Sequence, residues 1–295
     1  MLDSLQTDPI AFTIPIGDGF PIYWYGILIT LGIALGVLWA AREINRRGGD
    51  EDTFYTGVLI VVVSGYIFAR LWYVIQEIIA GNGAQYQTLL DVINIRRGGA
   101  NILGGFIGAA LVGVWYIRRQ RLNFWHYADV AGPALLLAQA IGRWGNFINQ
   151  ELYGPPTDQP WGILIDPAFR IAQFRDLPAD TRFHPTFLYE SIWLFAGFIL
   201  LVVLNNRFRD RWKPGTLFSL FLIWWGGGRT WIELFRPDQP AFGDSFVTYS
   251  MVLALAIAVT GIYILLALYD RLPAGFPGSQ QRRRRRVRKP KPRRD

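Results

Sequence analysis

Long uncharged stretches of apolar residues restrict the possible folds of this chain more than any other feature. The stretch 22–41 contains no Asp, Glu, Lys or Arg. It is long enough to cross the hydrocarbon core of a bilayer as an α-helix, which takes about 20 residues. Six more apolar stretches follow, at 54–79, 100–117, 125–147, 185–204, 215–235 and 246–268. We therefore predict an all-α integral membrane protein with about seven transmembrane helices.

The composition agrees with this prediction. Hydrophobic residues make up 52% of the chain and aromatic residues 15%, and the mean hydropathy is +0.22. A typical soluble domain is less apolar. The net charge of +8 comes from the last residues, since ten Lys or Arg lie within 282–294 and the rest of the chain is not basic. The chain has no cysteine, so a thiol in its chemistry would have to come from a substrate.

Arginine-rich segments predict the orientation in the membrane. They lie at 42–47, 118–121 and 207–213 and in the C-terminal tail. Because Lys and Arg are in excess in cytoplasmic loops, these segments are expected in the cytoplasm, with the N-terminus periplasmic and the C-terminus cytoplasmic. The outward segments would be 80–99, 148–183 and 236–245. Six arginines in those segments reduce the contrast, and contact with a ligand is one explanation for some of them: Arg96, Arg97, Arg170, Arg175, Arg182 and Arg236.

We divide the chain into three parts. Residues 1–21 form a periplasmic N-terminal arm, which lacks the basic start of a signal peptide because 1–20 contain no Lys or Arg. Residues 22–269 form the seven-helix membrane domain, with an outward loop at 150–183 that is expected to form a small cap. Residues 270–295 form a basic, disordered cytoplasmic tail that can contact anionic lipid. Nucleic-acid binding is not expected, because no aromatic residues are interleaved with these charges.

Polar residues gather near the outer ends of six of the seven stretches. At about 1.5 Å per residue, Arg143 lies roughly 27 Å along the fourth stretch and Arg229 roughly 21 Å along the sixth. Glu233 lies about one turn further out. The other polar or glycine-rich positions at this level are Tyr25, Arg70, Asn101 to Gly105, Tyr189 and Glu190. Polar groups at this depth are costly unless they bind something, so we predict one outward-facing site.

Arginines just below the headgroup level suit a phosphate-bearing lipid, because the guanidinium donates two parallel hydrogen bonds to phosphate oxygens. The alternative is that each arginine pairs with a nearby Glu or extends to the interface. For Arg70, seven residues before Glu77, both interpretations stay open. For Arg143 and Arg229 the functional interpretation is favoured, because both lie deep within apolar stretches. Arg229 and Glu233 are four residues apart and are expected to face each other.

Four segments together resemble the bacterial prolipoprotein diacylglyceryl transferases. The longest and most specific is GRWGNFINQELYG at 142–154, where a buried stretch meets a polar loop. The other three are YWYG at 23–26, HPTFLYE at 184–190 and RTWIELFRPD at 229–238. The resemblance extends from about residue 21 to residue 269 and leaves out the arm and the tail.

The resemblance implies an enzyme that transfers the diacylglyceryl group of phosphatidylglycerol to the lipobox cysteine of a prolipoprotein and releases glycerol phosphate. It implies a location in the bacterial cytoplasmic membrane with the site facing the outer leaflet. The expected partners are phosphatidylglycerol, the prolipoprotein signal peptide and membrane lipids, and no cofactor or metal is expected. Arg143 and Arg229 would be the essential phosphate-side arginines. The further implied or candidate binding positions are Tyr25, Asn101, Gly104, Asn146, Glu151, Gly154, Glu233 and Arg236.

One position departs from the family pattern. The family usually has a histidine, often proposed as the base, just before the Gly-Gly pair of the third stretch, and this chain has Leu103 there. His184 is on the outer side, although Pro185 after it favours a helix-start role over catalysis. Glu151 could accept a proton, and it could equally pair with Arg143. The sequence leaves the base unassigned.

Two other function classes remain open at this point. A polytopic transporter would show internal repeats and broken helices around a midplane site, and only Gly226 to Gly228 hint at an interruption. A lipid-binding homologue without catalysis is supported by Leu103 alone. The transferase is the main prediction.

Overall fold

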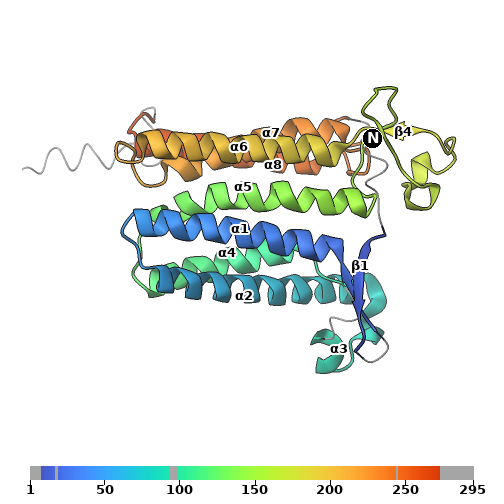
Figure 1. Cartoon of the computed structure of the whole chain (residues 1–295), viewed down its shortest axis with the longest axis horizontal. Coiled ribbons are helices and arrows are strands. Elements are labelled where there is room, and N and C mark those ends of the chain that lie inside the picture. The colour runs from blue at the N-terminus through green and yellow to red at the C-terminus, as the bar shows by residue number, and fades with distance from the viewer. Residues whose placement is uncertain (1–7, 17–18, 94–98, 244, 273–295) are drawn as a thin grey trace, which may run out of the picture. The chain divides into compact units, whose positions relative to one another are not determined.

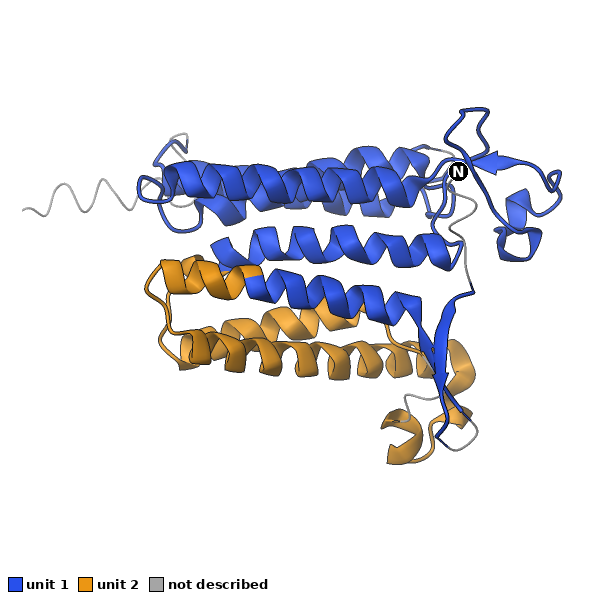
Figure 2. Ribbon diagram, in the orientation of Figure 1, with its two compact units in different colours: residues 1–38, 128–295 blue, residues 39–127 orange. Residues whose placement is uncertain are grey.

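The computed structural model describes residues 8–16, 19–93, 99–243 and 245–272. Arg96, Arg97 and the tail from residue 273 onward lie outside these residues. The chain divides into two compact units, 1–38 with 128–295, and 39–127 (Figure 2). Each unit is described by itself.

The first unit contains most of α1 (Trp24–Arg46) and α5 (Phe124–Ile148), and all of α6 (Thr186–Phe208), α7 (Thr216–Ile232) and α8 (Tyr249–Leu268) (Figure 1). Helix α7 packs against both α6 and α8. In α1, Gly32 and Gly36 meet Ala138 and Ala134 of α5, and a side chain at either glycine would press on backbone atoms of α5. Small residues let transmembrane helices approach closely, so this contact holds α1 against α5.

A buried carboxylate links the beginnings of α5 and α7. Asp129 accepts hydrogen bonds from the backbone N–H of Gly215 and of Phe218, both at 2.8 Å. These N–H groups belong to the first turn of α7, where no partner exists within the helix. A carboxylate is also favoured there by the helix dipole. Asp129 thus caps α7 from a different helix and ties the two together.

The loop between α5 and α6 folds into a small cap. It contains strands β3 (Ile163–Leu164) and β4 (Arg182–Phe183), which pair antiparallel, and two short 3-10 turns, Pro167–Phe169 and Ala172–Phe174. Its apolar core consists of Phe147, Tyr153, Ile163, Ile165, Phe183 and Phe187. Arg170 is 2% exposed and donates to the carbonyls of Ile165, Leu177, Pro178 and Ala179. Arg170 therefore holds the cap together.

The N-terminal arm forms a hairpin that the sequence pattern did not reveal. Strand β1 (Ile10–Ile14) pairs antiparallel with β2 (Phe20–Tyr23), and Gly19 at φ +91° lies in the turn between them. Strand β2 runs directly into α1.

The second unit is built on α2 (Glu51–Glu77) and α4 (Ile102–Arg119), which pack against each other. After α2 come a short π-helix (Ile78–Asn82), a 3-10 turn (Gly83–Gln85) and α3 (Leu89–Ile93). Arg70 is buried in α2 and donates to the carbonyls of Asp91, Val92 and Gly99. Arg70 therefore fixes the outer segment of its own unit, and Glu77 accepts instead from Asn82.

Five helical segments of the described residues are long and apolar enough to cross a membrane: Trp24–Arg46, Glu51–Gln85, Ile102–Arg119, Thr186–Phe208 and Tyr249–Leu268. Large apolar side chains on these helices face outward, among them Leu59, Leu111 and Ile192, each about three-fifths exposed. Such an apolar surface fits lipid and not water. The chain is thus a mostly helical, multi-pass membrane protein, as the sequence predicted.

Candidate functional site

Two arginines from different helices reach the same carboxylate oxygen in the first unit. The Nη2 of Arg143, near the end of α5, lies 2.7 Å from Oε1 of Glu190, near the start of α6. The Nη1 of Arg229, near the end of α7, lies 3.7 Å from the same oxygen. This Nη1 is buried and has no hydrogen-bond partner among the described residues. The structure therefore brings the two predicted phosphate-side arginines together at one carboxylate.

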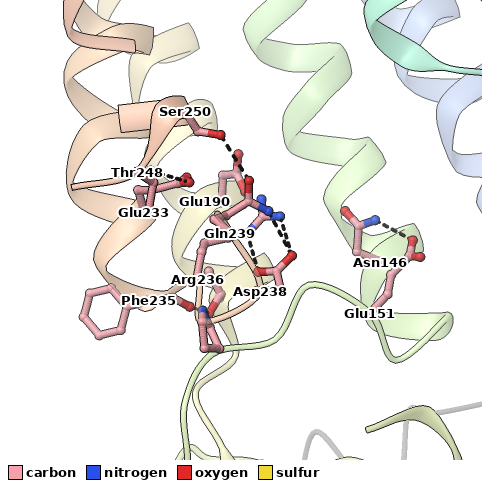
Figure 3. Close-up of polar contacts among 12 residues, drawn as sticks. Asn146, Glu151, Glu190, Glu233, Phe235, Arg236, Asp238, Gln239, Thr248 and Ser250 are labelled. Atoms are coloured by element: carbon pink, nitrogen blue, oxygen red, sulfur yellow. Dashed lines mark hydrogen bonds and ion pairs between the residues drawn. The ribbon is translucent and has the colours of Figure 1, made fainter. Parts of the chain in front are cut away.

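A second carboxylate fixes Arg229 from its own helix. Glu233 Oε2 lies 2.9 Å from Arg229 Nη2, which confirms that the two residues face each other. The other oxygen of Glu233 accepts from the hydroxyl of Thr248 at 3.0 Å (Figure 3). Glu233 is thus held from two sides and is 3% exposed. Arg229 lies between Glu190 and Glu233, and the side chain of Arg229 is 15% exposed.

A chain of polar groups continues from Arg143 to the loop after α5. Arg143 Nη1 donates to Asn146 Oδ1 at 3.2 Å. Asn146 Nδ2 in turn donates to Glu151 Oε1 at 2.7 Å (Figure 3). Asn146 is 4% exposed. Glu151 is therefore not the direct partner of Arg143 in this structure: Glu190 has that position, and Asn146 bridges to Glu151. The sequence allowed a direct pair between Arg143 and Glu151. In the structure, the side chain of Asn146 connects the two residues.

Tyr25 and Gly154 are positioned by close packing. The ring of Tyr25, in the first turn of α1, lies so close to Gly145 of α5 that no side chain fits at Gly145. The N–H of Gly154 donates to the carbonyl of His184 at 2.9 Å. A Cβ on Gly154 would lie 2.7 Å from both His184 Cβ and Thr186 Oγ1. Gly154 is thus required where the cap loop meets the start of α6.

His184 takes part in a hydrogen-bonded chain of aromatic residues. Trp161 Nε1 donates to the hydroxyl of Tyr189 at 2.7 Å, and this hydroxyl lies 2.9 Å from His184 Nδ1. The hydroxyl of Tyr189 can both donate and accept, so either neutral tautomer of His184 satisfies this contact. Burial also lowers the pKa of His184. With the proton on Nδ1, the ring donates to Tyr189 and Nε2 remains an acceptor, so a role of His184 as a base stays a prediction.

Arg236 follows the 3-10 turn Glu233–Phe235 and pairs with a nearby aspartate. Its Nε and Nη2 donate to the two oxygens of Asp238 at 3.2 and 3.1 Å (Figure 3). Burial raises the pKa of Asp238, but the hydrogen bonds and charge of Arg236 outweigh it, so the pKa is lowered overall. Gln239 donates to the same carboxylate and accepts from Ser250. Arg236 therefore orders the loop between α7 and α8.

Two predicted binding residues belong to the second unit. Asn101 is the N-cap of α4: its side chain accepts from the N–H of Leu103 and donates to Gln76, both at 2.8 Å. Gly104 lies so close to Trp72 and the backbone of Phe68 that any side chain would clash. Both residues thus have packing or capping roles within their unit. Leu103 is half-exposed and offers no group that can take a proton.

Sequence reasoning missed Glu190 as a site residue, although it noted the residue at the outer level of the fifth stretch. Its acidic side chain at the start of an apolar helix was the available signal. Thr248, the partner of Glu233, gave no such signal, because a threonine before an apolar stretch indicates only an N-cap, a role it also fills toward Met251.

Comparison with known proteins decides the family. The model of the prolipoprotein diacylglyceryl transferase family matches residues 9–267. The chain belongs to this family. The phosphatidylglycerol–prolipoprotein diacylglyceryl transferase of Bacillus cereus is 43% identical over 265 residues, which cover 88% of this chain and 92% of the relative. The proteins of the same name from Bacillus mycoides and Bacillus anthracis are 41% and 42% identical over the same shares.

These matches confirm the sequence-based prediction of a prolipoprotein diacylglyceryl transferase and identify the chain as a transferase of lipoprotein biosynthesis. They do not favour the transporter or the non-catalytic homologue. The roles of individual residues in this transferase are inferred from the geometry above.

Proposed function

We propose that this chain transfers the diacylglyceryl group of phosphatidylglycerol to the lipobox cysteine of a prolipoprotein. The approach of Arg143 and Arg229 to one oxygen of Glu190, at 2.7 and 3.7 Å, carries the proposal. The family and the printed names of the relatives supply the two substrate classes. Two guanidinium groups directed at one point suit a phosphodiester, because each can donate two parallel hydrogen bonds to phosphate oxygens.

The proposed reaction exchanges one bond for another. The cysteine sulfur forms a bond to the glyceryl carbon of the lipid, and the bond between that carbon and the phosphate oxygen breaks. The electron pair of the broken bond stays on the phosphate oxygen, and the thiol proton balances the charge of the released glycerol phosphate. Negative charge therefore grows on phosphate in the transition state, where preorganised donors in a water-poor site lower the barrier most.

The same arginines would assist the nucleophile. A free thiol has a pKa of about 8.5, and a nearby positive field raises its thiolate fraction. Leu103 cannot take the proton, and His184 Nδ1 is already in contact with the hydroxyl of Tyr189 at 2.9 Å. The base is left open, since Glu151 is engaged by Asn146 but retains a second carboxylate oxygen.

Two helices complete the proposed seven-span topology. Helix α5 has 25 residues, long enough at about 1.5 Å per residue to cross the bilayer. Helix α7 has 17 residues and continues in a 3-10 turn to Phe235. With these two included, the arginine-rich loops favour a periplasmic N-terminus and a cytoplasmic C-terminus in the inner membrane. The site at the ends of α5 and α7 then faces the outer leaflet, where secreted prolipoproteins arrive.

The test uses purified protein in detergent with phosphatidylglycerol and a peptide that carries a lipobox cysteine. Mass spectrometry of the peptide should detect one added diacylglyceryl group, and glycerol phosphate should appear in equal amount. Replacing the peptide cysteine by serine should abolish the product. Absence of modified peptide with the native chain, under conditions where it is folded, would refute the proposal and reopen the transporter and the lipid-binding homologue.

A further inference from the structure

Glu190 occupies the position that a phosphate would need, and this has a consequence for turnover. Its Oε1 forms an ion pair with Arg143 at 2.7 Å and lies 3.7 Å from Arg229, and Glu190 is 6% exposed. An anion placed between the two guanidinium groups must take over these contacts. Resting on the transferase function proposed above, we propose that Glu190 is a placeholder anion: phosphate displaces it on binding, and its return to the arginines expels glycerol phosphate.

The charges around the arginines support this role. Arg143 and Arg229 carry two positive charges, and Glu190 and Glu233 carry two negative ones, so these four side chains have no net charge. Glu233 is held by an ion pair with Arg229 and by a hydrogen bond from Thr248, whereas the contacts of Glu190 with the described arginines are ion pairs, at 2.7 Å to Arg143 and 3.7 Å to Arg229. Of the two carboxylates, Glu190 is the one that rotation of its own side chain could withdraw from both arginines while Glu233 keeps Arg229 in position.

The product binds such a site more strongly than the substrate does. Phosphatidylglycerol carries a phosphodiester with one negative charge, whereas the released glycerol phosphate is a monoester with about −1.5 to −2 charges at pH 7. Two guanidinium groups with little exposure to water would hold this product tightly and slow its release. A carboxylate that competes for the same donors weakens the binding of the product. When the product leaves, Glu190 forms its contacts with the arginines again, and these compensate for the lost phosphate contacts. Glu190 is thus a positioning residue that sets the affinity for phosphate.

The decisive variant is Glu190→Gln, which keeps the size of the side chain and removes its charge. Binding of glycerol phosphate, measured by calorimetry on detergent-solubilised protein, should tighten by about tenfold or more, since a contact between charged groups commonly contributes that much. In transfer assays the variant should show one rapid turnover followed by slow steady-state turnover, with inhibition by added glycerol phosphate strengthened in the same ratio. Unchanged or weakened glycerol phosphate binding would overturn the proposal.

Two further variants separate this role from a structural one. Glu190→Asp keeps the charge and shortens the side chain. Its inhibition by glycerol phosphate should therefore be closer to that of the native protein than that of Glu190→Gln is. Glu233→Gln removes an equal charge from Arg229 but not from Arg143, and its effect on glycerol phosphate binding should be clearly smaller. Equal tightening in Glu190→Gln and Glu233→Gln would overturn the placeholder role, because it would reflect net charge alone.

The binding measurement does not depend on turnover, so the two proposals can fail separately. Native protein that transfers lipid, with Glu190→Gln binding glycerol phosphate no more tightly, refutes the placeholder and leaves the transferase. Native protein that transfers nothing refutes the transferase, and the calorimetry still decides whether Glu190 competes with phosphate. Circular dichroism and gel filtration of each variant show whether a loss of binding comes from misfolding. If Glu190→Gln misfolds, the affinity of Glu190→Asp for glycerol phosphate becomes the test.

Discussion

The guanidinium of Arg143 and the carboxylate of Glu190 lie 2.7 Å apart and join the end of α5 to the start of α6. Arg229 approaches the same oxygen from α7. Three helices thus present one compact ionic group at the polar end of an otherwise apolar bundle. Ionisable groups at such a depth are expensive and are usually retained for function.

Arg143→Ala should abolish most lipid transfer. Removing one preorganised donor to the developing oxyanion costs roughly 10²–10³-fold in turnover. Arg143→Lys keeps the charge but loses the planar fork, so its transfer rate should fall less than that of the alanine variant. The measurement is the initial rate of peptide modification, with thermal unfolding of each variant as the control for folding. Near-native transfer by Arg143→Ala would contradict the assigned role.

Asn146→Ala should lower both stability and transfer, because it leaves Arg143 Nη1 and Glu151 without their bridge. Loss of a buried hydrogen-bond partner costs about 1–3 kcal/mol per group, which thermal unfolding in detergent would detect. Asn149→Ala is the matched control: its contact with Glu151 is long, at 3.4 Å, and exposed. If both alanine variants lost the same activity, the relay through Asn146 would not be the cause.

Gly154→Ala should disturb the join between the cap and α6. The new Cβ would lie 2.7 Å from His184 Cβ and Thr186 Oγ1 and 3.1 Å from the carbonyl of Phe235. Overpacking of this kind costs about 1–3 kcal/mol. Gly227→Ala in α7 is the control, since nothing lies within 4 Å of its Cβ, and it should leave the unfolding temperature equal or higher. An unfolding temperature of Gly154→Ala equal to that of the native chain would show that the contact is not tight.

Stability should fall at mildly acidic pH through His184. Burial lowers its pKa in the folded protein, so the unfolded chain takes up a proton first, near the ordinary value of about 6.5. Stability from this group is complete above that pH and is lost as the pH falls toward the folded pKa. The unfolding temperature between pH 7.5 and 5.5 should therefore drop more for the native chain than for His184→Gln. His126→Gln provides the control, and a native-like drop in His184→Gln would assign the pH dependence to other groups.

The helices could be predicted from the sequence because a long apolar stretch in a membrane protein has few possible structures other than a transmembrane helix. The predicted stretch 125–147 became α5, Phe124–Ile148, and 185–204 became α6, Thr186–Phe208. The hairpin of β1 and β2 was not predicted, since both strands are short and their pairing depends on a turn that contains Gly19 at positive φ. The fold of the cap was missed because it depends on carbonyls that converge on Arg170 only after the loop has closed.

The candidate site was predicted in its residue types and less well in its pairings. Arg229 and Glu233 follow from helical periodicity alone, and the structure confirms their pairing. The partner of Arg143 does not follow from helical periodicity, because Glu190 comes from another helix, whereas Glu151 is near Arg143 in the sequence. Periodicity describes one helix at a time, so contacts between helices require the packed bundle.

The hydrogen bonds of Asp129 with the first turn of α7 fix α5 and α7 relative to each other along their axes. Arg143 follows Asp129 by fourteen residues, and Arg229 follows Gly215 by the same fourteen. Both helices rise from this shared origin by about 21 Å, so the two guanidinium groups reach the same height. An insertion of a single residue in either segment would rotate one arginine by about 100° and spoil this match. The contact of Asp129 with the start of α7 thus sets the relative height of Arg143 and Arg229.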